Sequence, residues 1–273
     1  MNQKQSVFAT SWIILILIGC ATSPLGRSQL AFIPDSDIDR MGAQAFEVQK
    51  KNLPVVSDPQ VNQYVQCVAG TLTRQVKGNW EVLVFEEESA NAFALPSGKI
   101  GVHSGLLKVA RNQDQLAAVI GHEIGHVLAR HSNERASQQF AAQTGLSLTQ
   151  VLVGATVAPG TGQLLMGVLG LGAEYGILMP FSRVQESEAD LIGLDLMAKS
   201  GFDPRESVEL WRNMDADGPN NQIEFLSTHP SHGSRIEDLQ KRMPNAIQLW
   251  QNARAHGHNP ACQEPPRETK TQL

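Results

Sequence analysis

The sequence predicts an α+β fold that is mostly α-helical and carries one small β-sheet. Long segments place apolar residues at helical spacing; one such stripe consists of Val61, Tyr64, Val65, Val68 and Leu72. Three short segments between residues 81 and 103 are bounded by turn residues and have lengths typical of strands. The 273 residues are 41% hydrophobic but only 5% aromatic, so we expect a core built mainly on aliphatic side chains.

The charge balance and the cysteine count exclude two classes of protein. Lys+Arg 22 against Asp+Glu 27 gives a net charge of −5 without any basic run, so a protein that binds nucleic acid by neutralising phosphates is not expected. Three cysteines are too few for a disulfide scaffold. For Cys67 and Cys262, a disulfide and two free thiols both stay open.

The N-terminus has the pattern of a bacterial lipoprotein signal over residues 1–19. The apolar run Trp12–Ile18 is shorter than the roughly 20 residues that cross a bilayer, and it fits a secretory signal instead. The ending Leu17-Ile18-Gly19-Cys20 resembles a lipobox, which predicts acyl chains on Cys20 and a lipidated tether over 20–34. An ordinary signal peptide or a weak anchor is the alternative. Ala21 resembles the residue of lipoproteins held in the outer membrane and facing the periplasm.

Residues 35–250 are predicted to form one domain. In its first half we expect a helix over 35–51, a helix from Pro59, and strands over 81–85, 92–95 and 99–103. Asp58 can cap the second helix, and proline is favoured in a first turn. The last two strands are joined by a bend at Pro96-Ser97-Gly98.

The second half of the domain is predicted to be helical. Helices are expected from Asn112 to about Arg130, over 181–200, from Pro204 through Trp211 and over 236–243. Asn112 can cap the first of these, and Gly201 ends the second. Residues 251–273 are polar, and we expect a mobile tail there.

Residues 136–173 contain no charged residue. Pro159-Gly160 divides the segment into pieces too short to span a membrane, and its glutamines also argue against burial in lipid. A helical pair packed on the core is the expected structure. A flexible flap, or a surface that lies on the membrane, is the alternative.

The motif His122-Glu123-Ile124-Gly125-His126 lies on a predicted helix. Four residues cover about one helical turn, so the two imidazoles can reach one Zn²⁺ ion. Glu123 is displaced around the helix, where it can take a proton from a water and pass it to a leaving amine. These residues predict a catalytic zinc site.

A catalytic zinc site needs a third protein ligand. Glu186 and Asp190 share one face of a later helix, whereas Glu188 points elsewhere. We therefore expect Glu186 to bind the metal and Asp190 to orient a ligand histidine through its other ring nitrogen.

Together these motifs resemble a known peptidase family. His122–His126 with Glu186-x-x-x-Asp190 is similar to the family of the CAAX prenyl protease, the HtpX membrane protease and the mitochondrial Oma-type peptidases, within it most to periplasmic lipoproteins of the BepA and LoiP type. Three further segments agree: Asn91-Ala92-Phe93-Ala94-Leu95-Pro96, Val102-His103-Ser104-Gly105-Leu106, and Ser227-Thr228-His229-Pro230 followed by Arg235-Ile236. The resemblance spans about Asp35 to Met243.

The resemblance implies a gluzincin-like zinc metalloendopeptidase that degrades misfolded or stalled envelope proteins, with the outer-membrane assembly machinery as a further partner. It places the strand Asn91, Ala92, Phe93 and Ala94 at the cleft edge, where an extended peptide can bind through main-chain bonds. It also places His229 near the metal, either as an oxyanion donor or as a fourth ligand that closes the site. Arg235 is expected to orient that loop or to bind a substrate carbonyl.

The remaining histidines are expected to lack a catalytic role. His131 follows His126 by five residues, off the ligand face, and is expected at the surface. His103 is expected to belong to a strand, and His232 to have no duty at the metal. His256 and His258 form an HxH pair in the tail, to which we assign no site.

One rival function comes from a different class. A chaperone-like lipoprotein would bind unfolded outer-membrane proteins, with a latent or structural zinc site. Glu123 favours the enzyme, because a purely structural site has no use for a carboxylate beside the metal. A serine hydrolase is not expected, since no Gly-x-Ser-x-Gly elbow occurs.

Overall fold

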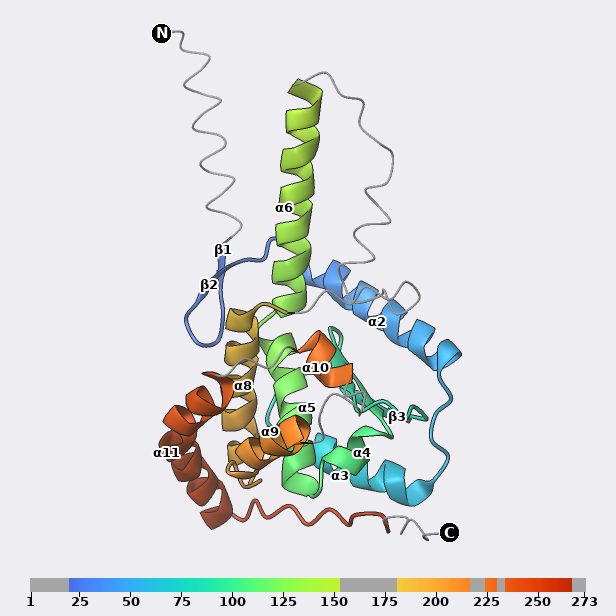
Figure 1. Cartoon of the computed structure of the whole chain (residues 1–273), viewed down its shortest axis with the longest axis vertical. Coiled ribbons are helices and arrows are strands. Elements are labelled where there is room, and N and C mark those ends of the chain that lie inside the picture. Colours follow the sequence, from blue (N-terminus) through green and yellow to red (C-terminus); the bar gives the residue numbers. More distant parts are fainter. Residues whose placement is uncertain (1–19, 153–180, 217–223, 230–233, 267–273) are drawn as a thin grey trace.

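The computed structural model describes residues 20–152, 181–216, 224–229 and 234–266. The predicted α+β, mostly helical class is confirmed (Figure 1). The helices are α2 (Asp35–Asn52), α3 (Pro59–Thr73), α4 (Leu106–Val109), α5 (Gln113–Leu128), α6 (His131–Leu152), α8 (Arg183–Lys199), α9 (Glu206–Ala216), α10 (Glu224–Thr228) and α11 (Ser234–Ala255).

Two small sheets accompany these helices. An antiparallel hairpin pairs β1 (Cys20–Thr22) with β2 (Ser28–Leu30). The second sheet contains β3 (Glu81–Phe85), β4 (Ala92–Leu95) and β5 (Lys99–His103) in the order β3-β5-β4. β5 is parallel to β3 and antiparallel to β4. The three strands predicted from the sequence are confirmed with the same bounds, and β4 lies at one edge of the sheet.

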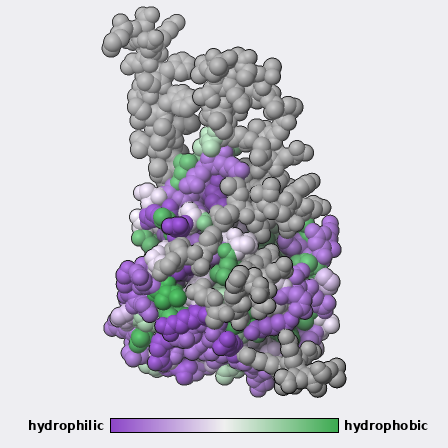
Figure 2. Space-filling view, viewed as in Figure 1, coloured by the Kyte–Doolittle hydropathy of each residue, from purple (hydrophilic) through white to green (hydrophobic). Residues whose placement is uncertain are grey.

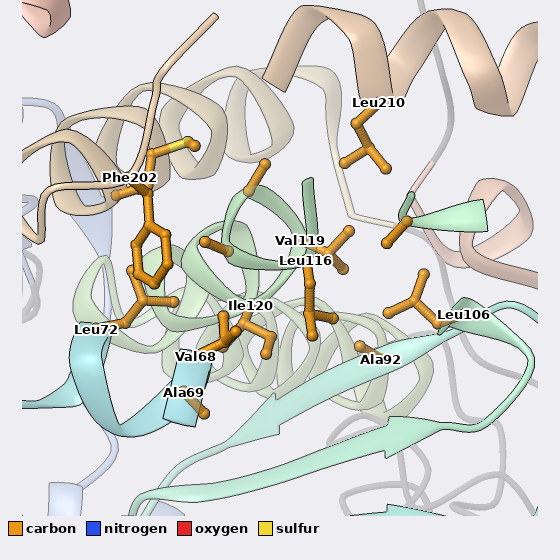
Figure 3. Packing of buried hydrophobic residues seen from close by; sticks show 14 of the residues in the cluster. Val68, Ala69, Leu72, Ala92, Leu106, Leu116, Val119, Ile120, Phe202 and Leu210 are labelled. Atoms are coloured by element: carbon orange, nitrogen blue, oxygen red, sulfur yellow. The ribbon is translucent and has the colours of Figure 1, made fainter. Parts of the chain in front are cut away.

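Helix α5 lies at the centre of the fold (Figure 1). Asn112 caps it, because its Oδ1 accepts a hydrogen bond from the Gln115 amide at 2.8 Å. Figure 3 shows Leu116, Val119 and Ile120 directed into the core between α3 and the strand that carries Ala92. These side chains are at most 1% exposed, so burial of apolar surface fixes the position of α5.

Helices α5 and α8 approach closely through glycines. A Cβ atom at Gly125 would lie 2.7 Å from the Ala189 carbonyl oxygen, and one at Gly193 would lie 2.7 Å from the Gly121 carbonyl carbon. Only glycine fits such a backbone contact without displacement. The close approach brings the first turn of α8, which begins with a capping box at Ser182, against the HExxH turn of α5.

The last helix is longer than predicted. We expected it to end at Met243, before Pro244, but α11 continues through Pro244 to Ala255. Proline is unfavourable inside a helix, and tertiary contacts beyond it compensate: Ala246 is fully buried, and the Trp250 indole donates to the Gly201 carbonyl at 3.1 Å. The end of the domain, which we predicted at residue 250, therefore falls inside α11.

Several predictions concern residues outside the described ranges, namely the signal over 1–19, the uncharged segment beyond Leu152, and His232. Among the described residues, no helix has the length and apolar character needed to cross a membrane. On the face shown in Figure 2, the hydrophobic residues form small separate groups among hydrophilic ones. Scattered apolar residues of this kind are normal on protein surfaces.

Candidate metal centre

His122 and His126 lie one turn apart on α5 and are both buried. Their ring centroids are 4.7 Å apart, and their Nε2 atoms are 3.0 Å apart. The helical repeat thus directs both Nε2 atoms to one point, as the sequence predicted.

Glu186, in the first turn of α8, brings a carboxylate to this point. Its Oε2 lies 3.5 Å from His122 Nε2, and its Oε1 lies 3.5 Å from His126 Nε2. Burial alone would raise the pKa of Glu186, but hydrogen bonds with His122 and His229 outweigh burial and hold its pKa far below the usual range. The carboxylate therefore stays charged, as a metal ligand must.

His229, which follows α10, adds a fourth donor. Its Nδ1 lies 3.3 Å from His122 Nε2 and 3.0 Å from Glu186 Oε1. Its ring is stacked on Phe225 at a centroid distance of 4.5 Å and on Phe181 at 5.5 Å. The two phenyl rings thus hold this imidazole among the ligand atoms.

Glu123 lies beside the ligands rather than among them. The backbone N–H of Ala94 in β4 donates to its carboxylate, and its Oε1 lies 3.4 Å from His229 Nε2. Burial raises the pKa of Glu123 above its ordinary value. A carboxyl group with a raised pKa is suited to receive a proton and release it again.

The other ring nitrogen of His122 is bound inside the core. His122 Nδ1 lies 2.9 Å from Asp190 Oδ1, and Arg235 donates to both oxygens of Asp190 at 2.7 Å. The Arg235 guanidinium also lies 3.0 Å from Glu186 Oε2 and 3.7 Å from the centre of the Trp211 ring. Burial would raise the pKa of Asp190, but Arg235 and His122 outweigh burial and lower it.

The other ring nitrogen of His126 is bound by a residue that we expected elsewhere. His131 was predicted to lie at the surface, and this prediction was wrong: its side chain is fully buried, with Nδ1 2.9 Å from His126 Nδ1. The helical phase does not continue past Leu128, because Arg130 adopts a left-handed φ of 56° and α6 begins anew at His131. Burial lowers the pKa of His131 despite its contact with Glu188.

Glu188 points away from the candidate metal ligands, as predicted, but it is buried, and both of its carboxylate oxygens have hydrogen-bond partners. It lies 3.1 Å from His131 Nε2, accepts from Arg27 Nε at 2.8 Å, and accepts from the Ser23 hydroxyl. Burial would raise the pKa of Glu188, but these hydrogen bonds outweigh burial and lower it to about 2. No local feature of the sequence connects residues so far apart.

Strand β4, predicted as the substrate edge, lies against α5. Asn91 is buried and its Oδ1 accepts from the Ala92 amide at 2.9 Å. The Phe93 ring packs on Phe85 with centroids 6.2 Å apart. Among the described strands, only β5 pairs with β4, so its second edge has no strand partner there.

The donor set fits a zinc ion. His122, His126, Glu186 and His229 each offer one ligand atom within 4.8 Å of the others, and imidazole nitrogens with a carboxylate oxygen are typical zinc ligands. Glu123 Oε1 is buried without a hydrogen bond from any described residue. This oxygen is thus free to accept a hydrogen bond from a group outside the described residues.

Two cysteines and three further histidines among the described residues make contacts outside this centre. Cys67 of α3 and Cys262 after α11 form a disulfide, with Cα atoms 5.7 Å apart. His103 belongs to β5, as predicted, and is buried next to Ser89. The exposed HxH pair makes separate contacts: His256 with Asn252, and His258 with Lys199 and Gln75.

Comparisons with known proteins agree with this geometry. A family model described as "Peptidase family M48" matches residues 56–243. The mitochondrial metalloendopeptidase OMA1 of Schizosaccharomyces pombe is 40% identical over 169 residues, which cover 61% of this chain and 48% of the relative. Human metalloendopeptidase OMA1 is 34% identical over 176 residues, or 63% of this chain and 34% of the relative.

A bacterial relative is similar over a longer part of the chain. The beta-barrel assembly-enhancing protease of Escherichia coli K12 is 29% identical over 210 residues, which cover 74% of this chain and 43% of that protein. The chain thus spans about half or less of the length of these relatives. The relatives named metalloendopeptidases agree with a metallopeptidase class for the chain. The resemblance found in the sequence is confirmed: the chain belongs to peptidase family M48.

Proposed function

We propose that this chain is a zinc metalloendopeptidase that hydrolyses peptide bonds in misfolded or stalled proteins of the bacterial envelope. The observation that carries the proposal is the buried Glu123 carboxylate next to the donor set His122, His126 and Glu186. The name of the Escherichia coli relative, a beta-barrel assembly-enhancing protease, supports a role in the envelope. The names of the OMA1 relatives support the peptidase activity alone.

We assign a role to each of these residues. His122, His126 and Glu186 would hold the metal in a gluzincin-like arrangement, and a zinc ion bound there polarises a peptide carbonyl and acidifies a water. Glu123 takes the proton of the attacking water and delivers it to the leaving amine nitrogen. Its raised pKa helps it to retain the proton between these two steps.

Strand β4 is the proposed binding site for the substrate backbone. Its second edge has no partner among the described strands, and Ala94 of this strand contacts the catalytic Glu123. An extended peptide added to this edge would bind through main-chain groups, which tolerate many side chains. Such tolerance suits a protease whose substrates share unfolded structure rather than a common sequence.

His229 is proposed to close the metal site at rest. Its Nδ1 lies among the ligand atoms, at 3.0 Å from Glu186 Oε1 and 3.3 Å from His122 Nε2, which suits a fourth ligand. As a gate, H229A would raise cleavage. As an oxyanion donor, the same substitution would lower kcat about 10²–10³-fold, so one rate measurement distinguishes the two roles.

Cys20 is the proposed lipid attachment site, which would tether the enzyme to the outer membrane facing the periplasm, near the outer-membrane assembly machinery. Cys20 is the first residue of β1, and thus of the hairpin that packs on the domain. C20S should abolish incorporation of labelled palmitate and release the protein from the membrane fraction. Unchanged labelling would contradict the anchor without affecting the peptidase.

The decisive test compares the full chain with its E123Q variant. Both are incubated with a reduced, alkylated protein as unfolded substrate, and zinc is counted by mass spectrometry. One zinc per chain in both proteins, with cleavage only by the wild type, would support the peptidase. One zinc without cleavage by wild type or H229A would favour the chaperone-like alternative, and cleavage by E123Q at the wild-type rate would overturn the assigned role of Glu123.

A further inference from the structure

The hairpin β1–β2, which we expected to be part of a tether, is docked on the domain. Arg27 in its turn forms a bidentate ion pair with Glu134 of α6, at 2.6 and 2.7 Å. Gln29 is buried and donates to the Ala129 carbonyl at 2.8 Å, at the break between α5 and α6. The hairpin therefore packs where the metal-binding helix ends, as Figure 1 shows.

Arg27 and Ser23 also converge on one buried carboxylate. Arg27 Nε donates to Glu188 Oε2 at 2.8 Å, and the Ser23 hydroxyl donates to Glu188 Oε1. Ser23 in turn accepts from the Arg27 amide at 3.1 Å, so the turn presents both side chains together. Both Glu188 oxygens are thus held by the hairpin.

The same carboxylate continues toward the metal ligands. Glu188 Oε2 lies 3.1 Å from His131 Nε2, and His131 Nδ1 lies 2.9 Å from His126 Nδ1. When His126 binds a metal through Nε2, its Nδ1 carries the proton and donates to His131 Nδ1. His131 then carries its own proton on Nε2 and donates to Glu188. Each hydrogen bond therefore fixes the direction of the next.

We propose that Arg27 and Ser23 are positioning residues for the metal ligand His126, acting through Glu188 and His131. The hairpin that begins at Cys20 is then a part of the metal centre. Groups that hold the second nitrogen of a ligand histidine fix its ring and raise its basicity, and their loss typically costs 10–100-fold in metal affinity. The inference concerns the metal affinity of the chain and does not require the proposed peptidase activity.

The test measures the zinc dissociation constant of the full chain by chelator competition. H131F and E188A should each weaken zinc binding about 10–100-fold, and R27A and S23A should weaken it less but measurably. Q29A is the control, because it removes the buried hydrogen bond from Gln29 to Ala129 and leaves Glu188 untouched. Of the contacts that lead to His126, it loses only the 3.4 Å hydrogen bond from Arg27 Nη2 to Gln29 Oε1. Its zinc affinity should equal that of the wild type.

Two further readouts separate positioning from simple loss of stability. E188Q keeps an oxygen that accepts from His131 and should recover part of the affinity lost in E188A. The visible spectrum of the Co²⁺-substituted chain should change in R27A and not in Q29A. Equal affinities and spectra in R27A, S23A and the wild type would overturn the inference, as would equal losses in R27A and Q29A; an absence of zinc binding in the wild type would instead refute the metal centre itself.

Discussion

The two α5 histidines proposed as zinc ligands are held in different ways. His122 is oriented by Asp190 and Arg235, and Arg235 is only 2% exposed. His126 is oriented by His131 and Glu188, and this chain of contacts ends at Arg27, whose side chain is 26% exposed. One ligand is thus supported entirely from the interior, and the other from a surface hairpin.

The difference predicts how each support can fail. Buried charges that hold each other cannot lose one partner without leaving the other unpaired in a medium of low polarity. Arg27 also pairs with buried carboxylates, those of Glu134 and Glu188, but its own guanidinium is partly exposed. Water can therefore replace part of the lost contact, and the penalty is smaller. We therefore expect the loss of a charge on the His122 side to destabilise the fold as well as the metal site, and the loss of Arg27 to weaken mainly the metal site.

The largest effect is expected from R235A. The substitution leaves the buried carboxylates of Asp190 and Glu186 without their cation, and we expect the free energy of unfolding to fall by about 3–5 kcal/mol. Urea denaturation of the metal-free protein measures this loss. R242A is the matched control on the same helix, because Arg242 pairs with Asp195 while 38% exposed, and it should cost about 1 kcal/mol or less. If R235A and R242A lowered the free energy of unfolding equally, the buried position of Arg235 would not explain its effect.

The disulfide tests whether any loss of stability disturbs the metal. Cys67 and Cys262 are separated by 195 residues in sequence and lie outside both supports. The double variant C67S/C262S should lower the free energy of unfolding by about 2–4 kcal/mol, mainly because the unfolded chain gains freedom. The zinc affinity of the folded protein should not change. Weakened zinc binding here would show that affinity follows global stability rather than ligand support.

The sequence indicated Asp190 on the interior side but not its pairing with Arg235, and it did not indicate the support of His126. Glu186 and Asp190 share one face of α8, and the HExxH spacing lies within α5. Helical periodicity within each segment was therefore enough to select these residues from the sequence. His131 was misplaced because its position was judged from the helical phase of residues 122–126, although the predicted helix ends near Arg130 and α6 begins with a new phase at His131. Arg27 contacts Glu188 across 161 positions, and such a tertiary contact leaves no local pattern.

The same contrast explains which elements were predicted well. The strands of the second sheet and the Asn112 cap depend on neighbouring residues, and they occur where expected. The end of α11 depends on packing of Ala246 and Trp250 against other parts of the fold, which outweighs the local preference of Pro244. Local signals therefore predicted elements, whereas their extent and docking required the tertiary structure.

A smaller effect is expected when Asp190 loses its charge but keeps its shape. D190N weakens the acceptor for His122 Nδ1, so zinc affinity should fall about 10–100-fold, or about 1.4–2.8 kcal/mol. Chelator competition measures the change. D195N is the control on the same helix, since Asp195 binds Arg242 and not a ligand histidine. If D195N lost as much affinity as D190N, the loss would come from α8 as a whole.

The smallest effect concerns the pH dependence of the hairpin. Burial would raise the pKa of Glu134, but hydrogen bonds from Arg27 and Gln185 outweigh burial and lower it. A carboxylate whose pKa is lowered on folding stabilises the protein above its unfolded pKa, and this stabilisation is lost as the pH falls through the folded pKa. The difference in unfolding free energy between wild type and E134Q should therefore be largest near neutral pH and shrink in acid.

We expect this difference to be about 1 kcal/mol or less, because Arg27 remains partly exposed. Urea denaturation of the metal-free proteins from pH 7 to pH 3 measures this difference in unfolding free energy. Both proteins contain the same histidines, so the effect of histidine protonation is the same in both and drops out of the difference. The R27A background supplies the control: there E134Q should no longer change the acid dependence, since the pair is already broken. An unchanged difference in that background would mean that Gln185, and not the hairpin, keeps Glu134 charged.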